Sequence, residues 1–157
     1  MKRIPIVLLI TACVAFCGCA PKTDQASPAP VSEVKAATSK PVIPEGVVSM
    51  NYINAASALA ADDFDKAKAA LTALAGESTG ELKTKAQAAA DAPQIAAMRD
   101  AFKAVSAIAT EMQLPPDYAV AFCPMYKGGA YWVQKKDALT NPYFGKAMLT
   151  CGSFVKS

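Results

Sequence analysis

One segment carries the strongest structural signal in the chain, IAAMRDAFKAVSAIATEM at residues 95–112. Large apolar side chains recur in it every three or four residues, which is the spacing of one face of a helix. Asp91 and Pro93 precede it as a cap and a first-turn proline, and Pro115 and Pro116 bring it to an end. We therefore predict a helix with one face buried in a core. The buried stripe consists of Ile95, Met98, Phe102, Val105, Ile108 or Ala109, and Met112.

Three weaker helices are expected before this one. Apolar residues recur at helical spacing in segments 47–61 and 64–75, and segment 81–90 is rich in alanine. The acidic pair at 62–63 ends the first helix and offers an N-cap to the second, which Gly76 is expected to stop. The methionines assigned to the core are Met50, Met98 and Met112.

The sequence changes character after the fourth helix. Residues 118–122, YAVAF, alternate large side chains with alanine, which predicts a short strand that runs into Cys123. Residues 153–155 are a suitable partner strand, and this pairing would bring Cys123 close to Cys151. The expected fold is mostly α: a single domain at 47–157 formed by a bundle of about four helices, a short two-stranded β element and a C-terminal loop region.

The start of the chain has the layout of a secretory signal peptide. Basic residues precede an apolar run at 4–16, which is too short to span a bilayer comfortably. Gly18 followed by Cys19 resembles a lipobox, in which the cysteine sulfur receives a diacylglycerol before cleavage. We predict a lipoprotein signal peptide at residues 1–18 and lipid attachment at Cys19. Cys13 is the alternative attachment site, less favoured because a cut there leaves a short apolar segment, and cleavage without any lipid is a third interpretation.

Residues 19–46 are rich in proline, alanine, serine, threonine and lysine, a composition in which neither helix nor strand propagates. We interpret them as a flexible tether between the lipid and the domain. These segments predict a protein of the bacterial cell envelope that is anchored to a membrane through its lipid and faces the periplasm. Ala20, rather than an aspartate, beside Cys19 favours the outer membrane.

Charge and composition exclude several classes of function. The chain has 16 basic and 13 acidic residues, and without Lys2 and Arg3 of the signal peptide the balance is 14 to 13. No basic stripe is present, so nucleic acid is not an expected partner. The absence of histidine excludes Ser/His/Asp and Cys/His catalysis and every histidine-ligated metal site. No nucleophile has a recognisable base beside it, so we do not expect an enzyme.

Sulfur donors gather in the last third of the chain. Cys123 and Met125 belong to the motif FCPM, and Met148 and Cys151 belong to MLTCG. Thiols and thioethers favour Cu(I) and other soft ions such as Ag(I). Pro124 turns the chain after Cys123, and one helical turn would place Met148 and Cys151 on the same face. The sequence therefore predicts a Cu(I) or Ag(I) site formed by Cys123, Met125, Met148 and Cys151.

The order of the motifs CPM, GA-x-W, NPYFG and M-x-x-CG resembles the DUF3347 family. This is a domain of unknown function found in exported proteins and at the C-terminal ends of some periplasmic adaptor subunits of heavy-metal efflux pumps. A weaker match extends upstream through LAADD at 59–63 and RDAFKAVS at 99–106, so that the resemblance covers nearly all of residues 47–155. It implies a compact helical domain associated with the handling of copper or related metals. The family's CPM and M-x-x-CG residues fall on Cys123, Met125, Met148 and Cys151.

Two functional hypotheses follow. The first is a lipid-anchored, non-enzymatic protein that holds a soft ion, with an efflux system or a metalloprotein under assembly as its partner. The second is an envelope interaction or structural module without a metal, in which Cys123 and Cys151 form the disulfide expected in an oxidising compartment. Other residues also have plain interpretations. Met125 and Met148 can fill a core. Trp132 either covers a Cu(I) centre or packs on the bundle, and Asn141, Pro142 and Gly145 need only form a turn.

Overall fold

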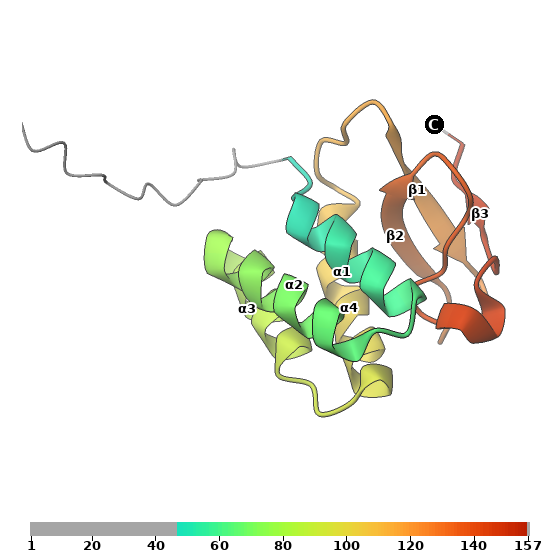
Figure 1. Cartoon of the computed structure of the whole chain (residues 1–157). Coiled ribbons are helices and arrows are strands. Elements are labelled where there is room, and N and C mark those ends of the chain that lie inside the picture. Colours follow the sequence, from blue (N-terminus) through green and yellow to red (C-terminus); the bar gives the residue numbers. More distant parts are fainter. Residues whose placement is uncertain (1–46, 157) are drawn as a thin grey trace, which may run out of the picture. The chain divides into compact units, whose positions relative to one another are not determined.

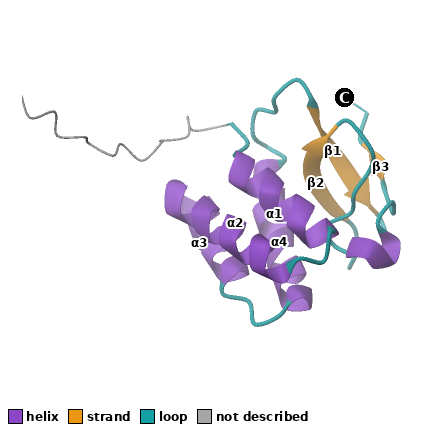
Figure 2. Ribbon diagram, in the orientation of Figure 1, coloured by secondary structure: helices purple, strands orange, loops and turns teal. Residues whose placement is uncertain are grey.

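The computed structural model describes residues 47–156, which fold as four helices followed by a small antiparallel sheet (Figure 1). This confirms a mostly α fold with a short β element (Figure 2). The predicted signal peptide, the tether and both candidate lipid-attachment residues, Cys13 and Cys19, lie outside the described residues. No helix within residues 47–156 is long and apolar enough to cross a membrane. The elements are α1 (Met50–Ala60), α2 (Phe64–Glu77), α3 (Gly80–Ala90), α4 (Ile95–Ala109), β1 (Tyr118–Cys123), β2 (Ala130–Lys135), the 3₁₀ helix η1 (Gly145–Met148) and β3 (Ser153–Phe154).

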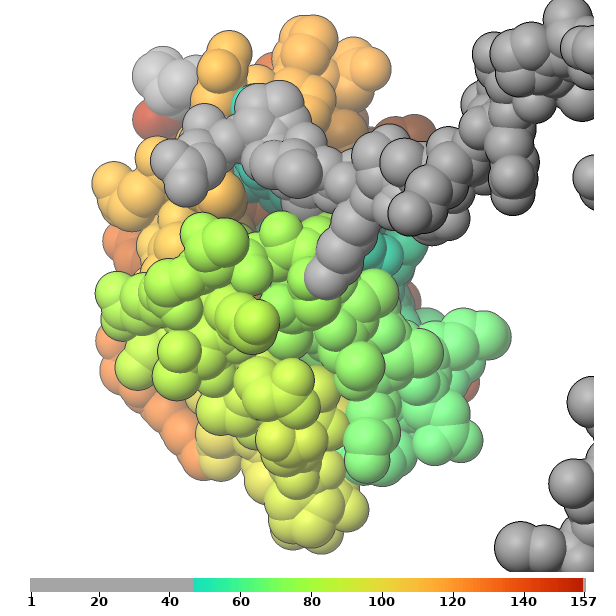
Figure 3. Space-filling model, turned by 90° about the vertical axis from the view of Figure 1, so that its left-hand side faces the viewer, coloured from blue at the N-terminus to red at the C-terminus, as the bar shows by residue number. Residues whose placement is uncertain are grey.

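The four helices pack in chain order, each against the next. The sheet contacts the bundle mainly through β2, which lies against α4 and α1. Helices α2 and α3 form a layer that fills much of the face seen in Figure 3, where they are coloured green. The buried side of this layer is made of small and medium-sized side chains, and the alanines among them allow the helices to approach closely. These side chains are Ala67, Leu71, Leu74, Ala75, Ala86, Ala89 and Ala90.

The helix ends agree with the sequence prediction in part. Asp63 caps α2 as expected, since its side chain accepts a hydrogen bond of 3.1 Å from the backbone N–H of Lys66. Gly76 is the last residue but one of α2, so the helix ends at Glu77, close to the predicted stop. Pro93 lies outside α4, whose first residue comes two positions later, so its assignment to the first helical position is wrong. Helix α4 also ends earlier than predicted, at Ala109.

The sheet has the strand order β2-β1-β3, and both pairings are antiparallel. The predicted pairing of β1 with β3 is confirmed, with Phe122 opposite Ser153. Strand β2 is an addition to the expected two-stranded element, and it pairs with all of β1. Its sequence hides the usual alternation because Trp132, Val133 and Gln134 are buried one after another.

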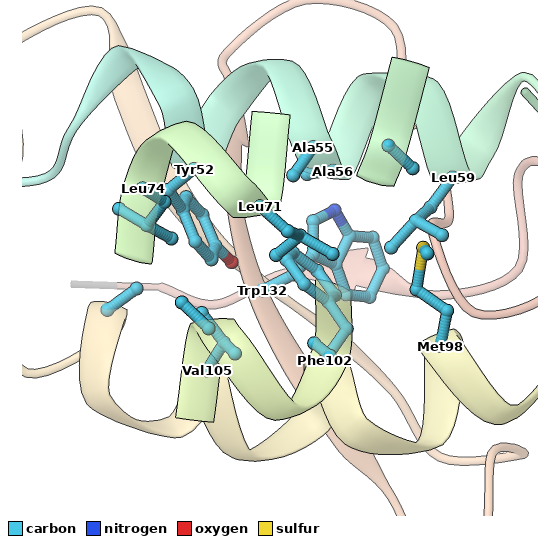
Figure 4. Packing of buried hydrophobic residues seen from close by; sticks show 14 of the residues in the cluster. Tyr52, Ala55, Ala56, Leu59, Leu71, Leu74, Met98, Phe102, Val105 and Trp132 are labelled. Carbon is cyan, nitrogen blue, oxygen red and sulfur yellow. The ribbon is translucent and has the colours of Figure 1, made fainter. Parts of the chain in front are cut away.

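The core joins the helices to the sheet. The ring of Tyr52 in α1 stacks on that of Phe102 in α4, with centroids 5.3 Å apart. The Tyr52 hydroxyl oxygen accepts a hydrogen bond of 3.1 Å from the backbone N–H of Val133 in β2. Burial of this hydroxyl raises the pKa of Tyr52 to about 12. Trp132 lies among the same side chains (Figure 4), so the expectation that it packs on the bundle is confirmed.

The methionines assigned to the core divide into three cases. Met98 is fully buried, and Met112 is partly buried and packs against the core. Met50 is 58% exposed, so its assignment to the core is wrong. It is the first residue of α1, and its sulfur lies 3.8 Å from the hydroxyl of Tyr118, where the helix faces solvent.

Candidate functional site

Cys123 and Cys151 meet in the structure. Their Sγ atoms lie 3.3 Å apart although the residues are 28 positions apart in the chain, and both are free thiols. Cys123 is the last residue of β1 and is fully buried, whereas Cys151 lies just before β3 and is partly exposed. The prediction that strand pairing brings these two residues together is therefore confirmed.

The loop before β3 is held by the buried side chain of Asn141. Its Nδ2 donates a hydrogen bond of 2.7 Å to the carbonyl oxygen of Cys151, and its Oδ1 accepts one of 2.8 Å from the backbone N–H of Tyr143. Its own backbone N–H donates to the carbonyl oxygen of Leu149. Asn141 therefore does more than form the turn expected from the sequence: it fixes the backbone position of Cys151.

Gly152 allows the strand that carries Cys151 to lie directly on β1. Its φ of +132° is one that side chains disfavour. A Cβ atom at this position would lie 2.6 Å from the carbonyl oxygen of Phe122 and 3.0 Å from the Trp132 ring. The absence of a side chain therefore permits the close approach that sets the two cysteine sulfurs against each other.

The two candidate methionines are not packed in the core. Met125 is 65% exposed and Met148 is 41% exposed, so the interpretation of both as core filler is wrong. Met125 lies in the turn that follows Cys123, and the Met148 carbonyl oxygen accepts a hydrogen bond of 3.0 Å from the Cys151 backbone N–H. Helix η1 ends at Met148, so the single helical turn expected to join Met148 and Cys151 is replaced by this tighter turn.

The turn that carries Met125 is attached to α4. The Asp100 carboxylate accepts hydrogen bonds from the Tyr126 hydroxyl and from Lys127 Nζ, both at 2.5 Å. Lys103 Nζ donates a further hydrogen bond of 3.0 Å to the Lys127 carbonyl oxygen. The hydrogen bonds from Lys127 and Tyr126 hold the pKa of Asp100 below its usual range. These contacts fix the chain that leaves Cys123.

A second attachment holds the NPYFG segment. Arg99 donates through Nη2 to Asp62 Oδ1 at 2.5 Å and through Nε to the Pro142 carbonyl oxygen at 2.9 Å. The backbone N–H of Lys146 donates to the other Asp62 oxygen at 3.1 Å. The hydrogen bond from Arg99 lowers the pKa of Asp62. Gly145 lies directly against this ion pair with a φ of +58°, and any side chain there would collide with both charged groups.

Tyr143 packs at the centre of the aromatic residues around the site. Its ring centroid lies 5.9 Å from that of Trp132 in an edge contact and 4.8 Å from that of Tyr126. Its hydroxyl donates a hydrogen bond to the Tyr131 carbonyl oxygen. Burial raises the pKa of Tyr143, which keeps the hydroxyl protonated. Tyr143, Trp132 and Cys123 belong to one buried hydrophobic cluster, against which Cys151 packs, so the cysteine pair has an apolar side.

The reactive groups of this site are the two thiols of Cys123 and Cys151. The hydrogen bond with Cys123 raises the pKa of the Cys151 thiol, which lowers the fraction present as thiolate at neutral pH, and a bound cation would raise that fraction by displacing the proton. Residues 47–156 contain no group of three or more cysteines, aspartates and glutamates that could hold a metal ion. A metal site at this pair therefore has two thiols as its only strong donors within residues 47–156, and any further ligand would have to be a thioether or an outside group.

Comparisons of the chain with models of protein families, with curated proteins and with solved structures found no match. The roles of Arg99, Asp100 and Asn141 were not anticipated from the sequence. Arg99 and Asp100 lie in the segment RDAFKAVS and Asn141 begins NPYFG, and no periodic pattern in the sequence marks their partners.

Proposed function

We propose that this protein is a lipid-anchored envelope protein that binds a soft metal ion, Cu(I) or Ag(I), through Cys123 and Cys151 with help from Met125 and Met148. The observation that carries the proposal is that the Sγ atoms of Cys123 and Cys151 lie 3.3 Å apart although the two residues are 28 positions apart in the chain. We propose no enzymatic activity.

The donor set favours a soft ion over a hard one. Two thiols supply polarisable sulfur, which prefers Cu(I), whereas Mg²⁺ and Ca²⁺ need several oxygen ligands. Cys123 belongs to the same buried hydrophobic cluster as Trp132 and Tyr143, and Cys151 packs against that cluster. An apolar wall excludes water and so protects a monovalent ion from competing ligands.

The sulfur spacing lies between that of a disulfide and that of a metal site. With a metal–sulfur bond of about 2.3 Å, as in zinc sites, two thiolates at a tetrahedral angle lie about 3.8 Å apart, and the two sulfurs of a disulfide lie about 2.05 Å apart. The pair at 3.3 Å would open to hold an ion and close to form a disulfide. Both states are therefore within reach of small side-chain movements, and the soft donor set supports the metal-bound state.

The exposed methionines suit the entry and exit of an ion. Met125 follows Cys123 by two residues and Met148 precedes Cys151 by three, and both side chains are exposed, so they can turn without disturbing the core. Thioethers are weaker ligands than thiolates and can pass an ion on. The resemblance to the DUF3347 family supports an efflux system or a metalloprotein under assembly as the recipient, with the lipid at Cys19 and the tether holding the domain near the membrane.

A competition titration tests the proposal. The reduced mature chain is titrated with Cu(I) in the presence of a bathocuproine-type competitor, and we expect one ion per chain. Cys123→Ser and Cys151→Ser should abolish binding, and Met125→Leu or Met148→Leu should weaken it. Met50→Leu is the matched control, because the exposure of Met50, 58%, lies between those of Met148 and Met125, and Met50 belongs to α1. Failure of the reduced chain to compete for Cu(I), or Cu(I) binding by both cysteine variants as strong as that of the unaltered chain, would remove the proposal.

The second candidate is a structural or interaction module with a Cys123–Cys151 disulfide. The same short contact favours it, since only small movements separate these thiols from a bond. Counting free thiols in protein purified from the periplasm without reductant separates the two functions. A chain that is fully bonded and cannot be loaded with metal after mild reduction would favour this module.

A further inference from the structure

The two cysteines differ sharply in access. The Cys123 side chain has no exposed surface and sits on the central strand of the sheet, paired on both sides. Cys151 is partly exposed and belongs to a loop. A disulfide that arrives from solvent must bring one of its sulfurs into contact with the attacking sulfur. Only Cys151 offers that approach.

We propose that the pair also performs thiol–disulfide exchange in a fixed order, with Cys151 as the attacking sulfur, Cys123 as the resolving sulfur and a small disulfide as the partner. The partial exposure of Cys151 favours a small partner, because a disulfide recessed in a folded protein could not reach it. The 3.3 Å between the sulfurs then places Cys123 ready for the second step.

The electrons and bonds balance in two steps. The Cys151 thiolate attacks one sulfur of the partner disulfide, forms a mixed disulfide and releases one thiolate of the partner. The Cys123 thiolate then attacks the Cys151 sulfur, forms the Cys123–Cys151 disulfide and releases the second thiolate. The cysteine pair is oxidised by two electrons, the partner disulfide is reduced, and the two released thiolates take up the protons lost by the cysteines.

The contacts that hold the two cysteines suit their roles as resolving and attacking residues. Cys123 is held by its pairing with Ala130 of β2, and the preceding residue Phe122 pairs with Ser153 of β3, so the resolving sulfur keeps its place. Cys151 is held mainly through its backbone, by Asn141 and by the turn at Met148. Its side chain can therefore turn outward to the partner and back to Cys123 while the loop stays in position.

The exchange would control the metal site, and this consequence rests on the proposed function. A disulfide has no thiolate to offer, so oxidation of the pair would release a bound soft ion and reduction would restore binding. The protein would then hold its ion only while the pair is reduced. The exchange order itself does not require a metal.

The test uses the mature chain with Cys19→Ser, in which Cys123 and Cys151 are the only thiols. Each metal-free, reduced protein is mixed with oxidised glutathione and followed by intact mass. We expect Cys123→Ser to accumulate one glutathionyl group, Cys151→Ser to react at least ten times more slowly, and the chain with both cysteines to lose its two thiol hydrogens without accumulating the adduct. Equal rates for the two variants, or faster reaction of Cys151→Ser, would overturn the proposed order.

A second measurement does not depend on the folding of the variants. Brief treatment of the reduced chain with iodoacetamide, followed by peptide mapping, should label Cys151 before Cys123; the reverse order would also overturn the proposal. Ag(I) titration of the oxidised and reduced chains then tests the link to the metal site. If neither form binds Ag(I) or Cu(I), the proposed function fails while the exchange order stands. If Cys123 reacts first but the reduced chain binds Ag(I), the exchange order fails while the proposed metal binding stands.

Discussion

The α2–α3 layer and the segment from β1 to residue 156 are built on different principles. The helical layer depends on contacts that are close in sequence: caps such as Asp63, and small apolar side chains facing the neighbouring helices. The C-terminal segment depends on polar contacts between distant residues, such as Arg99 with Pro142 and Asn141 with Cys151. The candidate site lies in the second region, where a few specific hydrogen bonds decide the geometry.

This difference indicates where substitutions should affect stability alone and where they should also affect the cysteine pair. A change in the α2–α3 layer should alter the free energy of unfolding without altering the reactivity of the thiols. A change in the C-terminal segment should alter both. The predictions below test that division.

The largest effect is expected where the two regions share a core. Phe102 of α4 packs against Tyr52 of α1 and Tyr143 of the C-terminal loop. Phe102→Ala should lower the free energy of unfolding by about 3–5 kcal/mol, because it removes a buried ring and leaves a cavity. Urea denaturation followed by circular dichroism measures this. A loss below about 1 kcal/mol would show that the helices and the sheet do not depend on a common core.

The next effect should be confined to the C-terminal segment. Asn141→Ala leaves the Cys151 carbonyl and the Tyr143 N–H without their buried partner and should cost about 2–3 kcal/mol. It should also free the Cys151 loop, so that Cu(I) affinity falls and both thiols react faster with iodoacetamide. Gln87→Ala on the exposed side of α3 is the control, since its amide bonds only Asp91. If Asn141→Ala lowers the stability but leaves the iodoacetamide reaction rates of both thiols unchanged, Asn141 does not position Cys151.

The same division explains what the sequence could predict about the fold. Each helix could be predicted because the spacing of its apolar residues is a local property of the sequence. In α4, for example, the regularly spaced Met98, Phe102 and Val105 are all buried. Strand β2 was missed because its residue types do not alternate: Val133 is buried on the face where Tyr131 and Lys135 are exposed, and the polar Gln134 is buried on the other face.

The candidate site was predictable to a similar extent. The meeting of Cys123 and Cys151 followed from pairing two strand-like segments, and it was found. The exposure of Met125 and Met148 was not, because an apolar residue in a turn carries no periodic signal that separates core from surface. The partners of Arg99 and Asp62 lie tens of residues away in sequence, and no local pattern specifies them.

A smaller, pH-dependent effect is expected at the turn after Cys123. The folded pKa of Asp100 is lowered by Lys127 and Tyr126, so its contribution to stability is present above the unfolded pKa of about 3.9 and is lost as the pH falls through the folded value. Asp100→Asn should cost under about 1 kcal/mol at pH 7, because the pair is exposed. It should also reduce the loss of stability below about pH 4, as measured by thermal unfolding across pH. An unchanged acid profile would contradict a role for this carboxylate.

The smallest effect should be a gain in the helical layer. Thr72 is exposed in the middle of α2, and its hydroxyl donates a hydrogen bond of 2.9 Å to the Lys68 carbonyl oxygen, which is already part of the helix. Thr72→Ala removes a β-branched residue of lower helix propensity and should stabilise the protein by about 0.5 kcal/mol. Because α2 is stabilised locally, Cu(I) affinity and the thiol reaction rates should not change. A change in either would mean that the helical layer and the cysteine pair are coupled, and the division between the two regions would have to be abandoned.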